Sequence, residues 1–342
     1  MKALSAPVVL TPGEPAGIGA EITAKAWDQL KSRKGLSFAL LSDAGHVRAT
    51  LARAGIAVAI QPIADVAEAS AVFANALPVL HRPLPHAVTA GKFSAATSGW
   101  VTDAIAEAVG MCLSNVAAAM VTNPIQKEAL YAAGFPHQGH TDFLAALARA
   151  KGYAAEDVMM LVGEGLRTIP VTVHIPLKDV ASQLTTANIV SQALIVSNGL
   201  RKYFGINAPR LAVAGLNPHA GENGTIGRED LEIVTPAVAI LRDMGIHVTG
   251  PLPADTAFLP AARAAYDAIL CMYHDQALIP VKTLDFHGGV NVTLGLPFVR
   301  TSPDHGTALA LAGTGKAQAE SLIAALDLAH AMSENARRAN EH

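Results

Sequence analysis

The sequence is poor in cysteine, in aromatic residues and in charge. Among its 342 residues are 2 cysteines; aromatic side chains make up 5% and charged side chains 15%, and the net charge is -3. So small a net charge provides no basic field for a nucleic-acid backbone, and so few aromatic rings provide no platform for stacked bases. The composition therefore argues against a nucleic-acid partner.

The two cysteines, Cys112 and Cys271, lie in a predicted helix and a predicted buried strand, and their spacing is not that of a metal site. Both are typical of small core residues in a protein of a reducing compartment. No apolar segment reaches membrane-spanning length, and residues 1–10 contain no cleavable signal pattern. We therefore expect a cytoplasmic protein with no membrane partner.

Hydrophobic residues make up 51% of the chain, and short apolar runs alternate with longer amphipathic stretches. This alternation predicts an α/β fold with a mostly parallel sheet and helices on both faces, and the length predicts two lobes. The proline-rich segment 77–92 cannot be helical and is expected to be irregular. Predicted strands span 8–10, 38–41, 57–60, 117–121, 158–162, 167–173, 210–216, 247–250, 267–272 and 290–294, and predicted helices span 21–30, 46–54, 95–113, 187–204, 228–244 and 316–335.

Three histidines follow predicted strands directly. His174 closes the run 169–173, His219 follows the run 211–216, and His274 follows the run 268–272. The carboxyl ends of strands in an open α/β sheet are where such folds place their chemistry, and each histidine is expected to enter a loop. Each imidazole alone would be explained by hydrogen bonds to loop backbone, but three at equivalent positions indicate a metal site.

A second group of residues suits an anionic ligand. His140 and Thr141 begin a predicted helix, where free amide groups favour phosphate, although a helix cap alone would explain Thr141. Lys282, Asn291 and Arg300 follow His274, and a lysine and an arginine beside a metal can bind a doubly anionic substrate. Ordinary surface charge is the alternative for each basic residue taken singly.

Two glycine-rich segments allow more than one interpretation. Residues 11–19 follow the first strand, but their spacing does not match a dinucleotide fingerprint, so they form either a tight turn or part of the active cleft. Residues 305–315 contain small side chains around a predicted helix, suited to close packing against a flat ligand or against another helix.

The chain resembles the 4-hydroxythreonine-4-phosphate dehydrogenase family, the NAD-dependent enzymes of pyridoxal phosphate (vitamin B6) biosynthesis, from about residue 10 to about residue 315. The resemblance is carried by GEPAGIG, TNPIQKEAL, GHTDFLA, VTVH, GLNPHAGENG, GPLPADT, MYHDQALIPVK and VNVTLGLPFVRTSPDHGTALALAGTG. It implies a two-lobed fold similar to isocitrate and isopropylmalate dehydrogenases, and a homodimer with active sites at the subunit interface. We expect residues 1–135 and 301–342 to form one lobe, on the cofactor side, and residues 136–300 to form a second lobe with the metal, substrate and dimer contacts.

The resemblance also implies roles for particular residues. His174, His219 and His274 would hold one divalent metal, with one or more ligands from the partner subunit. Five positions match those that bind the small phosphorylated amino-acid substrate, and three match a cofactor loop: His140, Thr141, Lys282, Asn291 and Arg300 for the substrate, and Gly306, Thr307 and Ala308 for NAD or NADP. Departures from the family pattern are Glu14, Ala20 and Gln126, none of which replaces a histidine or a basic residue of the site.

The implied reaction oxidises the C3 hydroxyl of 4-phosphooxy-L-threonine with NAD, and decarboxylation then gives 3-amino-2-oxopropyl phosphate and CO2. Asp255, Asp275 and Lys282 are candidates to accept the hydroxyl proton, and Asp275 is equally suited to orient an imidazole. Zinc favours imidazole ligands, whereas manganese, cobalt or magnesium tolerates more oxygen ligands.

Other functions remain open at this point. On the same fold, the substrate would be a phosphorylated threonate or erythronate, or a cis-dihydrodiol. A non-catalytic metal-binding or sensor protein has no need of the basic substrate-binding residues, and a hydrolytic metalloenzyme would use a metal-bound water in place of NAD.

Overall fold

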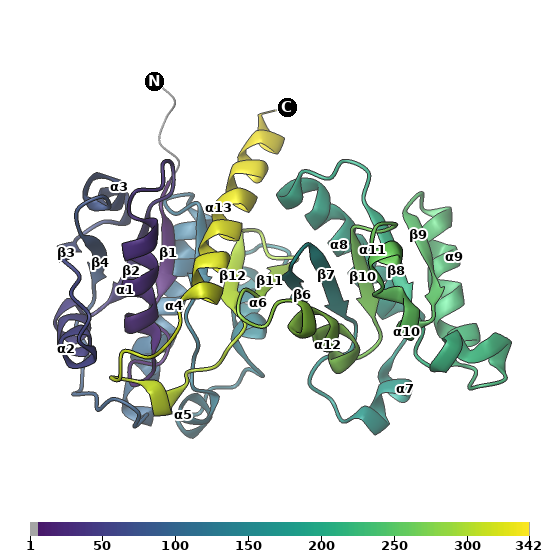
Figure 1. Ribbon diagram of the computed structural model, residues 1–342, viewed down its shortest axis with the longest axis horizontal. Coiled ribbons are helices and arrows are strands. Elements are labelled where there is room, and N and C mark those ends of the chain that lie inside the picture. Colours follow the sequence, from purple (N-terminus) through teal and green to yellow (C-terminus); the bar gives the residue numbers. More distant parts are fainter. Residues whose placement is uncertain (1–5, 342) are drawn as a thin grey trace. The chain divides into compact units, whose positions relative to one another are not determined.

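The computed structural model describes residues 6–341, and these form two compact units. Residues 6–157 and 296–337 form the first unit, and residues 158–295 and 338–341 form the second. The chain therefore passes from the first unit into the second and back (Figure 1). Residues 1–5, half of the segment in which the sequence predicts no signal pattern, lie outside the described residues.

The first unit contains a parallel sheet in the order β3-β4-β2-β1-β5-β12. Its strands are β1 (Val8–Thr11), β2 (Phe38–Ser42), β3 (Ile60–Ile63), β4 (Leu77–His81), β5 (Ala119–Thr122) and β12 (Arg300–Pro303). Its main helices are α1 (Gly19–Leu30), α2 (Ala44–Ala54), α4 (Ser98–Leu113), α5 (Lys127–Ala132), α6 (His140–Ala150) and α13 (Glu320–Asn340), of which α13 ends beyond the unit boundary. Parallel strands covered by helices confirm the predicted α/β class.

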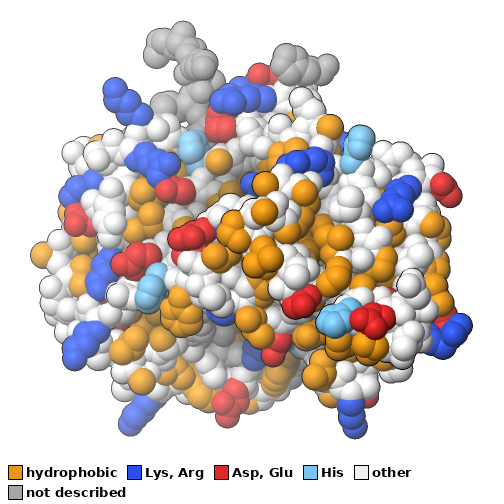
Figure 2. Space-filling model, turned by 45° about the vertical axis from the view of Figure 1, so that its right-hand side comes forward, with side chains coloured by type: hydrophobic (Ala, Val, Ile, Leu, Met, Phe, Trp, Pro, Cys, Tyr) orange, Lys and Arg blue, Asp and Glu red, His pale blue; other side chains and the backbone are white. Residues whose placement is uncertain are grey.

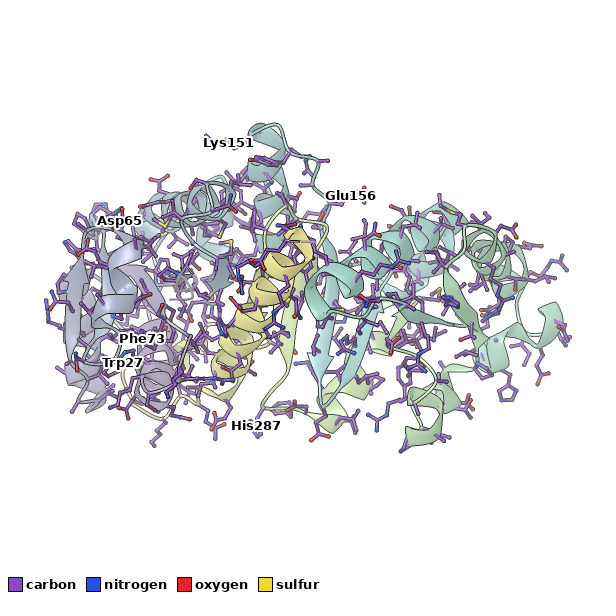
Figure 3. All side chains as sticks on the ribbon, turned by 90° about the horizontal axis from the view of Figure 1, so that it is seen from above. Trp27, Asp65, Phe73, Lys151, Glu156 and His287 are labelled. Atoms are coloured by element: carbon purple, nitrogen blue, oxygen red, sulfur yellow. The ribbon has the colours of Figure 1, made fainter. Side chains whose placement is uncertain are left out.

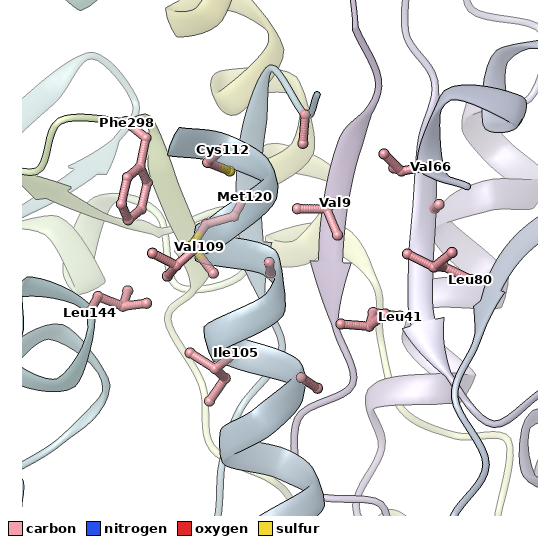
Figure 4. Packing of buried hydrophobic residues seen from close by; sticks show 14 of the residues in the cluster. Val9, Leu41, Val66, Leu80, Ile105, Val109, Cys112, Met120, Leu144 and Phe298 are labelled. Carbon is pink, nitrogen blue, oxygen red and sulfur yellow. The ribbon is translucent and has the colours of Figure 1, made fainter. Parts of the chain in front are cut away.

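Alternate strand residues build the core of this unit. Val9, Leu41 and Met120 point toward α4 and pack against its apolar positions, including Ile105 (Figure 4). On α1, the indole N–H of Trp27 donates to the backbone oxygen of Phe73 at 2.8 Å (Figure 3). Apolar contacts thus hold α4 on the strands, and a buried hydrogen bond holds α1 to the end of the short helix α3 (Ala69–Val72).

The second unit contains a mixed sheet in the order β11-β6-β7-β10-β8-β9. The pairs β11·β6 and β6·β7 are antiparallel, and the remaining neighbours are parallel. The strands are β6 (Val158–Gly163), β7 (Leu166–Pro170), β8 (Arg210–Ala214), β9 (His247–Leu252), β10 (Ala268–Cys271) and β11 (Val290–Leu294). The main helices are α8 (Thr186–Phe204), α9 (Thr235–Asp243) and α12 (His274–Leu284).

Helices cover both faces of this sheet. A Cβ on Gly163 would lie 2.9 Å from Val281 of α12, so β6 and α12 are in close contact. Leu294, which pairs with Val158 and so faces the other side, lies against Gly199 of α8. Both small residues permit an approach that a larger side chain would block.

Several elements differ from the sequence expectation. The segment 77–92 was expected to be irregular, yet it begins with strand β4, and β12 and α12 were not expected at all. Helix α6 belongs to the first unit rather than to the expected second lobe, because Leu144, Ala145 and Ala148 pack in one core cluster with the apolar residues of α4. Both cysteines are buried and unpaired, as expected.

The surface and the helices add two observations. On the face shown in Figure 2, basic and acidic side chains are interspersed and no broad area carries a single sign. No helix within residues 6–341 combines the length and the apolar character needed to cross a membrane.

Candidate active site

The three histidines of the predicted metal site follow three adjacent strands. His174 follows β7, His274 follows β10 and His219 follows β8, and β10 lies between the other two and parallel to both. Their carboxyl ends therefore meet at one edge of the second unit's sheet, where open α/β sheets bind ligands. The observed strand order thus brings the three histidine-bearing strand ends to the same edge.

His174 and His274 lie close to each other. Their ring centroids are 5.6 Å apart at an interplanar angle of 44°. With metal–nitrogen bonds of about 2 Å, two imidazoles on one ion have ring centres roughly 5 to 6 Å apart. The pair therefore has the separation that a shared divalent ion requires.

His274 begins helix α12, whereas the sequence predicts a loop after it. Its Nδ1 is 2.7 Å from Oδ1 of Asp275, which leaves Nε2 for a ligand. His274 and Asp275 line two concavities. One, of about 270 Å³, also contains His174 and Leu177, and the other, of about 420 Å³, also contains Lys282.

His219 lies in a strained loop. The five residues 219–223, within η4 (Pro218–Gly224), are all left-handed, with φ of 54°, 53°, 76°, 42° and 55°. L-residues normally visit this region singly, at a cost of about 1–2 kcal/mol each, and such strain is concentrated at functional sites. The loop presents the His219 side chain 60% exposed to solvent.

Two carboxylates, those of Glu222 and Asp255, interact with the His219 imidazole. Its Nδ1 is 2.8 Å from Oε1 of Glu222. That hydrogen bond and the charge of Glu222, followed by the charge of Asp255, raise the pKa of His219. Like Asp275 beside His274, Glu222 occupies Nδ1 and leaves Nε2 available, the arrangement common for metal-binding histidines.

Within residues 6–341 of one chain, no three His, Cys, Asp or Glu side chains converge closely enough to hold a metal ion. The donor chemistry nevertheless fits a divalent metal, because His174 and His274 are correctly spaced and two of the three imidazoles have an orienting carboxylate.

Lys282 and Asn291 also belong to the second unit. Lys282 lies two turns after His274 on α12, and its Nζ is 5.8 Å from the ring centroid of Phe286. Asn291 lies on β11 opposite Leu161, and its Oδ1 is buried without a hydrogen-bond partner among the described residues. A buried acceptor of this kind indicates a missing donor.

Arg300, His140 and Thr141 belong to the first unit. Arg300, at the start of β12, is 3% exposed, and its Nε and Nη2 donate to the hydroxyl of Thr122 at 3.2 and 2.5 Å. Burial lowers the pKa of Arg300 to about 9, which leaves it charged at neutral pH. A buried guanidinium of this kind is suited to an anionic ligand.

His140 lies at the N-terminus of α6. Burial, then the charges of Arg300 and Lys127, hold its pKa well below the usual range, so the imidazole is neutral. Its Nε2 is buried and has no hydrogen-bond partner among residues 6–341. The helix N-terminus, the unpaired ring nitrogen and the nearby cations form a site for an anion.

Thr141 is not the helix cap that the sequence predicts. The N-cap is Gly139, and Thr141 is the second residue of α6, with its hydroxyl bonded to Asp157. Lys127 was not among the predicted site residues, yet a Cβ on Gly139 would lie 3.4 Å from its Nζ. Its position, five residues after the end of β5 in the segment TNPIQK, is the sequence signal that could have identified it.

The glycine-rich segments pack against each other in the first unit. Ile18 N donates to the Thr307 oxygen at 3.2 Å, and Thr307 Oγ1 donates to Gln126 Oε1 at 2.9 Å. Ala308 is left-handed, with φ of 44°, and Gly306 has open space where a Cβ would be. The three predicted cofactor residues thus lie on a loop that contacts the first loop.

Glu14 lies in that first loop, and its side chain is buried. Burial raises its pKa despite a hydrogen bond from Ala16 N. With His86 and Lys92 it lines a concavity of about 250 Å³, so the first loop both turns tightly and borders a cavity.

Comparison with known proteins identifies the family. The model of the pyridoxal phosphate biosynthetic protein PdxA matches residues 37–329. The 4-hydroxythreonine-4-phosphate dehydrogenase of Caulobacter vibrioides is 50% identical over 95% of this chain and 97% of its own, and that of Methylorubrum extorquens is 51% identical over 95% and 93%.

Solved structures agree with this assignment. The crystal structure of 4-hydroxythreonine-4-phosphate dehydrogenase from Klebsiella pneumoniae matches with a TM-score of 0.86 and 39% identity, covering 97% of this chain and 99% of the other. A terephthalate 1,2-cis-dihydrodiol dehydrogenase from Burkholderia xenovorans matches with a TM-score of 0.64 and 28% identity, covering 96% and 98%. The chain therefore belongs to the PdxA family of pyridoxal phosphate biosynthetic proteins.

Proposed function

We propose that this protein oxidises the C3 hydroxyl of 4-phosphooxy-L-threonine with NAD and that decarboxylation follows, giving 3-amino-2-oxopropyl phosphate and CO2, in pyridoxal phosphate biosynthesis. The names of its relatives support this activity. The observation that carries the proposal is the anion site at His140 and Arg300, because the named substrate has a phosphate group.

The phosphate would be bound by buried positive charge and by the unpaired ring nitrogen of His140. Arg300 contributes a buried guanidinium, and Lys127 adds a second positive charge near His140. Neutral His140 donates from Nε2 if Nδ1 carries no proton, and α6 contributes backbone N–H groups. Thr141, Lys282 and Asn291 complete the proposed set of substrate-binding residues.

His174, His219 and His274 would hold one divalent metal, zinc, magnesium, manganese or cobalt. The spacing of His174 and His274 and the carboxylates on Nδ1 of His219 and His274 support this assignment. When bound, the metal lowers the pKa of the substrate hydroxyl and stabilises negative charge, and NAD, or NADP in its place, accepts hydride.

The protein's own groups would position the alcohol and remove its proton. Asp275 and Asp255 are exposed carboxylates beside His274 and His219, and Lys282 lies along α12 from His274. Because Asp275 is committed to the His274 ring, its role is to orient that imidazole. Asp255 or Lys282 then accepts the single hydroxyl proton. Gly306, Thr307 and Ala308 would contact the cofactor.

We further propose a homodimer in which at least one metal ligand comes from the partner subunit. Large apolar side chains beside the histidines are exposed in the single chain: Leu177 is 70% exposed and Ile279 is 62% exposed. Both line the concavities that contain His274. A partner subunit on this surface would bury them and would supply a ligand that completes the site.

The test is NADH formation by purified, metal-loaded protein with three substrates: 4-phosphooxy-L-threonine, 4-phosphoerythronate and a cis-dihydrodiol. The proposal requires the first to have the highest kcat/KM and to release CO2. Faster turnover of the sugar-acid phosphate or of the dihydrodiol would assign the protein to those reactions. Phosphate release without NADH would indicate hydrolysis, and a metal-binding protein without turnover would indicate a sensor.

A further inference from the structure

One buried side chain connects two of the histidine-bearing strand ends. Gln276, which is 8% exposed, accepts from Met272 N at 2.6 Å through Oε1 and donates to the Gly215 oxygen at 2.8 Å through Nε2. Met272 precedes His274 by two residues, and Gly215 precedes His219 by four. One amide group therefore bridges the carboxyl ends of the paired strands β10 and β8.

A second buried group holds the loop that carries His219. Asp230, 2% exposed, accepts from Leu216 N at 2.7 Å, and from both N and Nδ2 of Asn217 at 3.0 Å. It lies in a short π-helical turn, η5 (Asp230–Val234), a feature common at functional sites. Its carboxylate thus receives three hydrogen bonds from the two residues just before the left-handed run.

The loop packs closely around Asp230. A Cβ on Gly215 would lie 2.7 Å from the Ala220 Cα and 3.0 Å from Asp230 Oδ1, and one on Gly221 would lie 3.2 Å from Asp230 Oδ2. The left-handed residues 219–223 are intrinsically unfavourable, so contacts outside the run must hold them. At the start of the loop Asp230 makes such contacts to two backbone N–H groups, and Glu229 adds one more by accepting from Asn217 Nδ2 at 2.8 Å.

We infer that Asp230 and Gln276 are positioning residues for the metal site: Asp230 fixes the loop of His219, and Gln276 fixes that loop relative to His274. Neither side chain is itself among the proposed metal ligands. The inference rests on the proposed function, because it presumes that His219 and His274 bind metal. Their burial and their hydrogen bonds to the backbone distinguish them from the exposed carboxylates Glu222 and Asp275 beside the rings.

The test compares Asp230→Asn and Gln276→Met with a matched control, Asp267→Asn. Asp267 also accepts from a backbone N–H and from side-chain nitrogens, all of Arg210, but at the opposite ends of β8 and β10. Asp230→Asn turns an amide N–H toward the donors of Leu216 and Asn217, and Gln276→Met keeps the length and removes both hydrogen bonds. Affinity for Co²⁺ is measured by calorimetry, with folding checked by circular dichroism and thermal unfolding.

We expect each positioning variant to bind Co²⁺ about 10-fold more weakly, as when partners of metal ligands are removed. Asp267→Asn lowers the unfolding temperature but leaves Co²⁺ affinity unchanged. Equal affinity losses in all three variants, or no loss in the two positioning variants, would overturn the inference. Failure of both positioning variants to fold while Asp267→Asn folds would also overturn it, because the residues would then serve the fold alone.

His219→Ala separates this inference from the proposed function. If His219→Ala binds Co²⁺ as tightly as the unmodified protein, the three-histidine assignment fails. If it loses binding while Asp230→Asn and Gln276→Met keep it, only the positioning role fails. Steady-state kinetics give a second readout, because misplaced ligands lower kcat at saturating substrate. Active-site titration gives the concentration of active sites, so that a smaller amount of folded protein does not lower the calculated kcat.

Discussion

The imidazoles of His174 and His274 lie with ring centroids 5.6 Å apart, although 99 residues lie between them in the sequence. We predict that His274→Ala lowers metal affinity by more than about 100-fold, since loss of a ligand should exceed the 10- to 100-fold effect of losing its partner. Metal content after dialysis against a fixed free Co²⁺ concentration measures this. His247→Ala, at the amino end of β9, is the control and should retain the metal.

Arg300 and Thr122 provide a second test. Arg300→Lys removes the planar fork while keeping the charge, and we expect kcat/KM for the phosphorylated substrate to fall about 10- to 100-fold, the equivalent of one charged hydrogen bond. Arg210→Lys, on the surface, should leave kcat/KM unchanged. An Arg300→Lys enzyme with the original kcat/KM would show that phosphate binds elsewhere.

His140 makes folding stability depend on pH. Its pKa in the folded protein is depressed by burial, so below about pH 6.5 the unfolded chain takes up a proton that the folded chain does not. This group therefore contributes a loss of stability as the pH falls from about 6.5, by at most about 1.4 kcal/mol per pH unit. We expect His140→Asn to show a shallower decline in urea denaturation between pH 6.5 and 5. Identical slopes would mean that His140 is protonated in the folded state.

The proposed cofactor loop is anchored by a buried carboxylate. Glu21, on α1, is 0% exposed and accepts from the backbone N–H groups of Gly313 and Gly315. We expect Glu21→Gln to weaken NADH binding several-fold and to destabilise the fold by about 1.5–3 kcal/mol, because charge-assisted hydrogen bonds are lost. NADH fluorescence titration and urea unfolding measure the two effects. Asp28→Asn, on the exposed side of α1, is the control. Unchanged NADH affinity in Glu21→Gln would mean that this loop does not bind the cofactor.

Exposed apolar side chains beside the histidines test the proposed dimer. We expect Leu177→Asp combined with Ile279→Asp to give monomers at micromolar concentration, because buried charges oppose association. These monomers should also lose metal, since one ligand comes from the partner. Sedimentation velocity and metal analysis provide the readouts, and Val116→Asp, in the first unit, is the control. A monomeric double variant that retains full metal content would contradict the shared site.

Local pattern was sufficient for much of the fold. Apolar runs predicted β1, β2, β6, β8, β10 and β11 near their observed bounds, because a buried parallel strand needs a continuous apolar segment. Strand β4 was missed because Pro78 and Pro83 indicated an irregular segment, and β12 was missed because Arg300 and Ser302 are polar, although both are buried. Helix α12 was missed because Pro280 interrupts its pattern.

The sequence by itself determined the family resemblance, the α/β class and the three histidines after strands, since these depend on local composition and on long motifs. Only the tertiary structure decided that β7, β10 and β8 are neighbours, that Lys127 lies beside Gly139, and that Gln276 and Asp230 fix the histidine loops. The physical reason is that strand order and buried hydrogen bonds join residues distant in sequence. Their partners are chosen by packing, which no local pattern encodes.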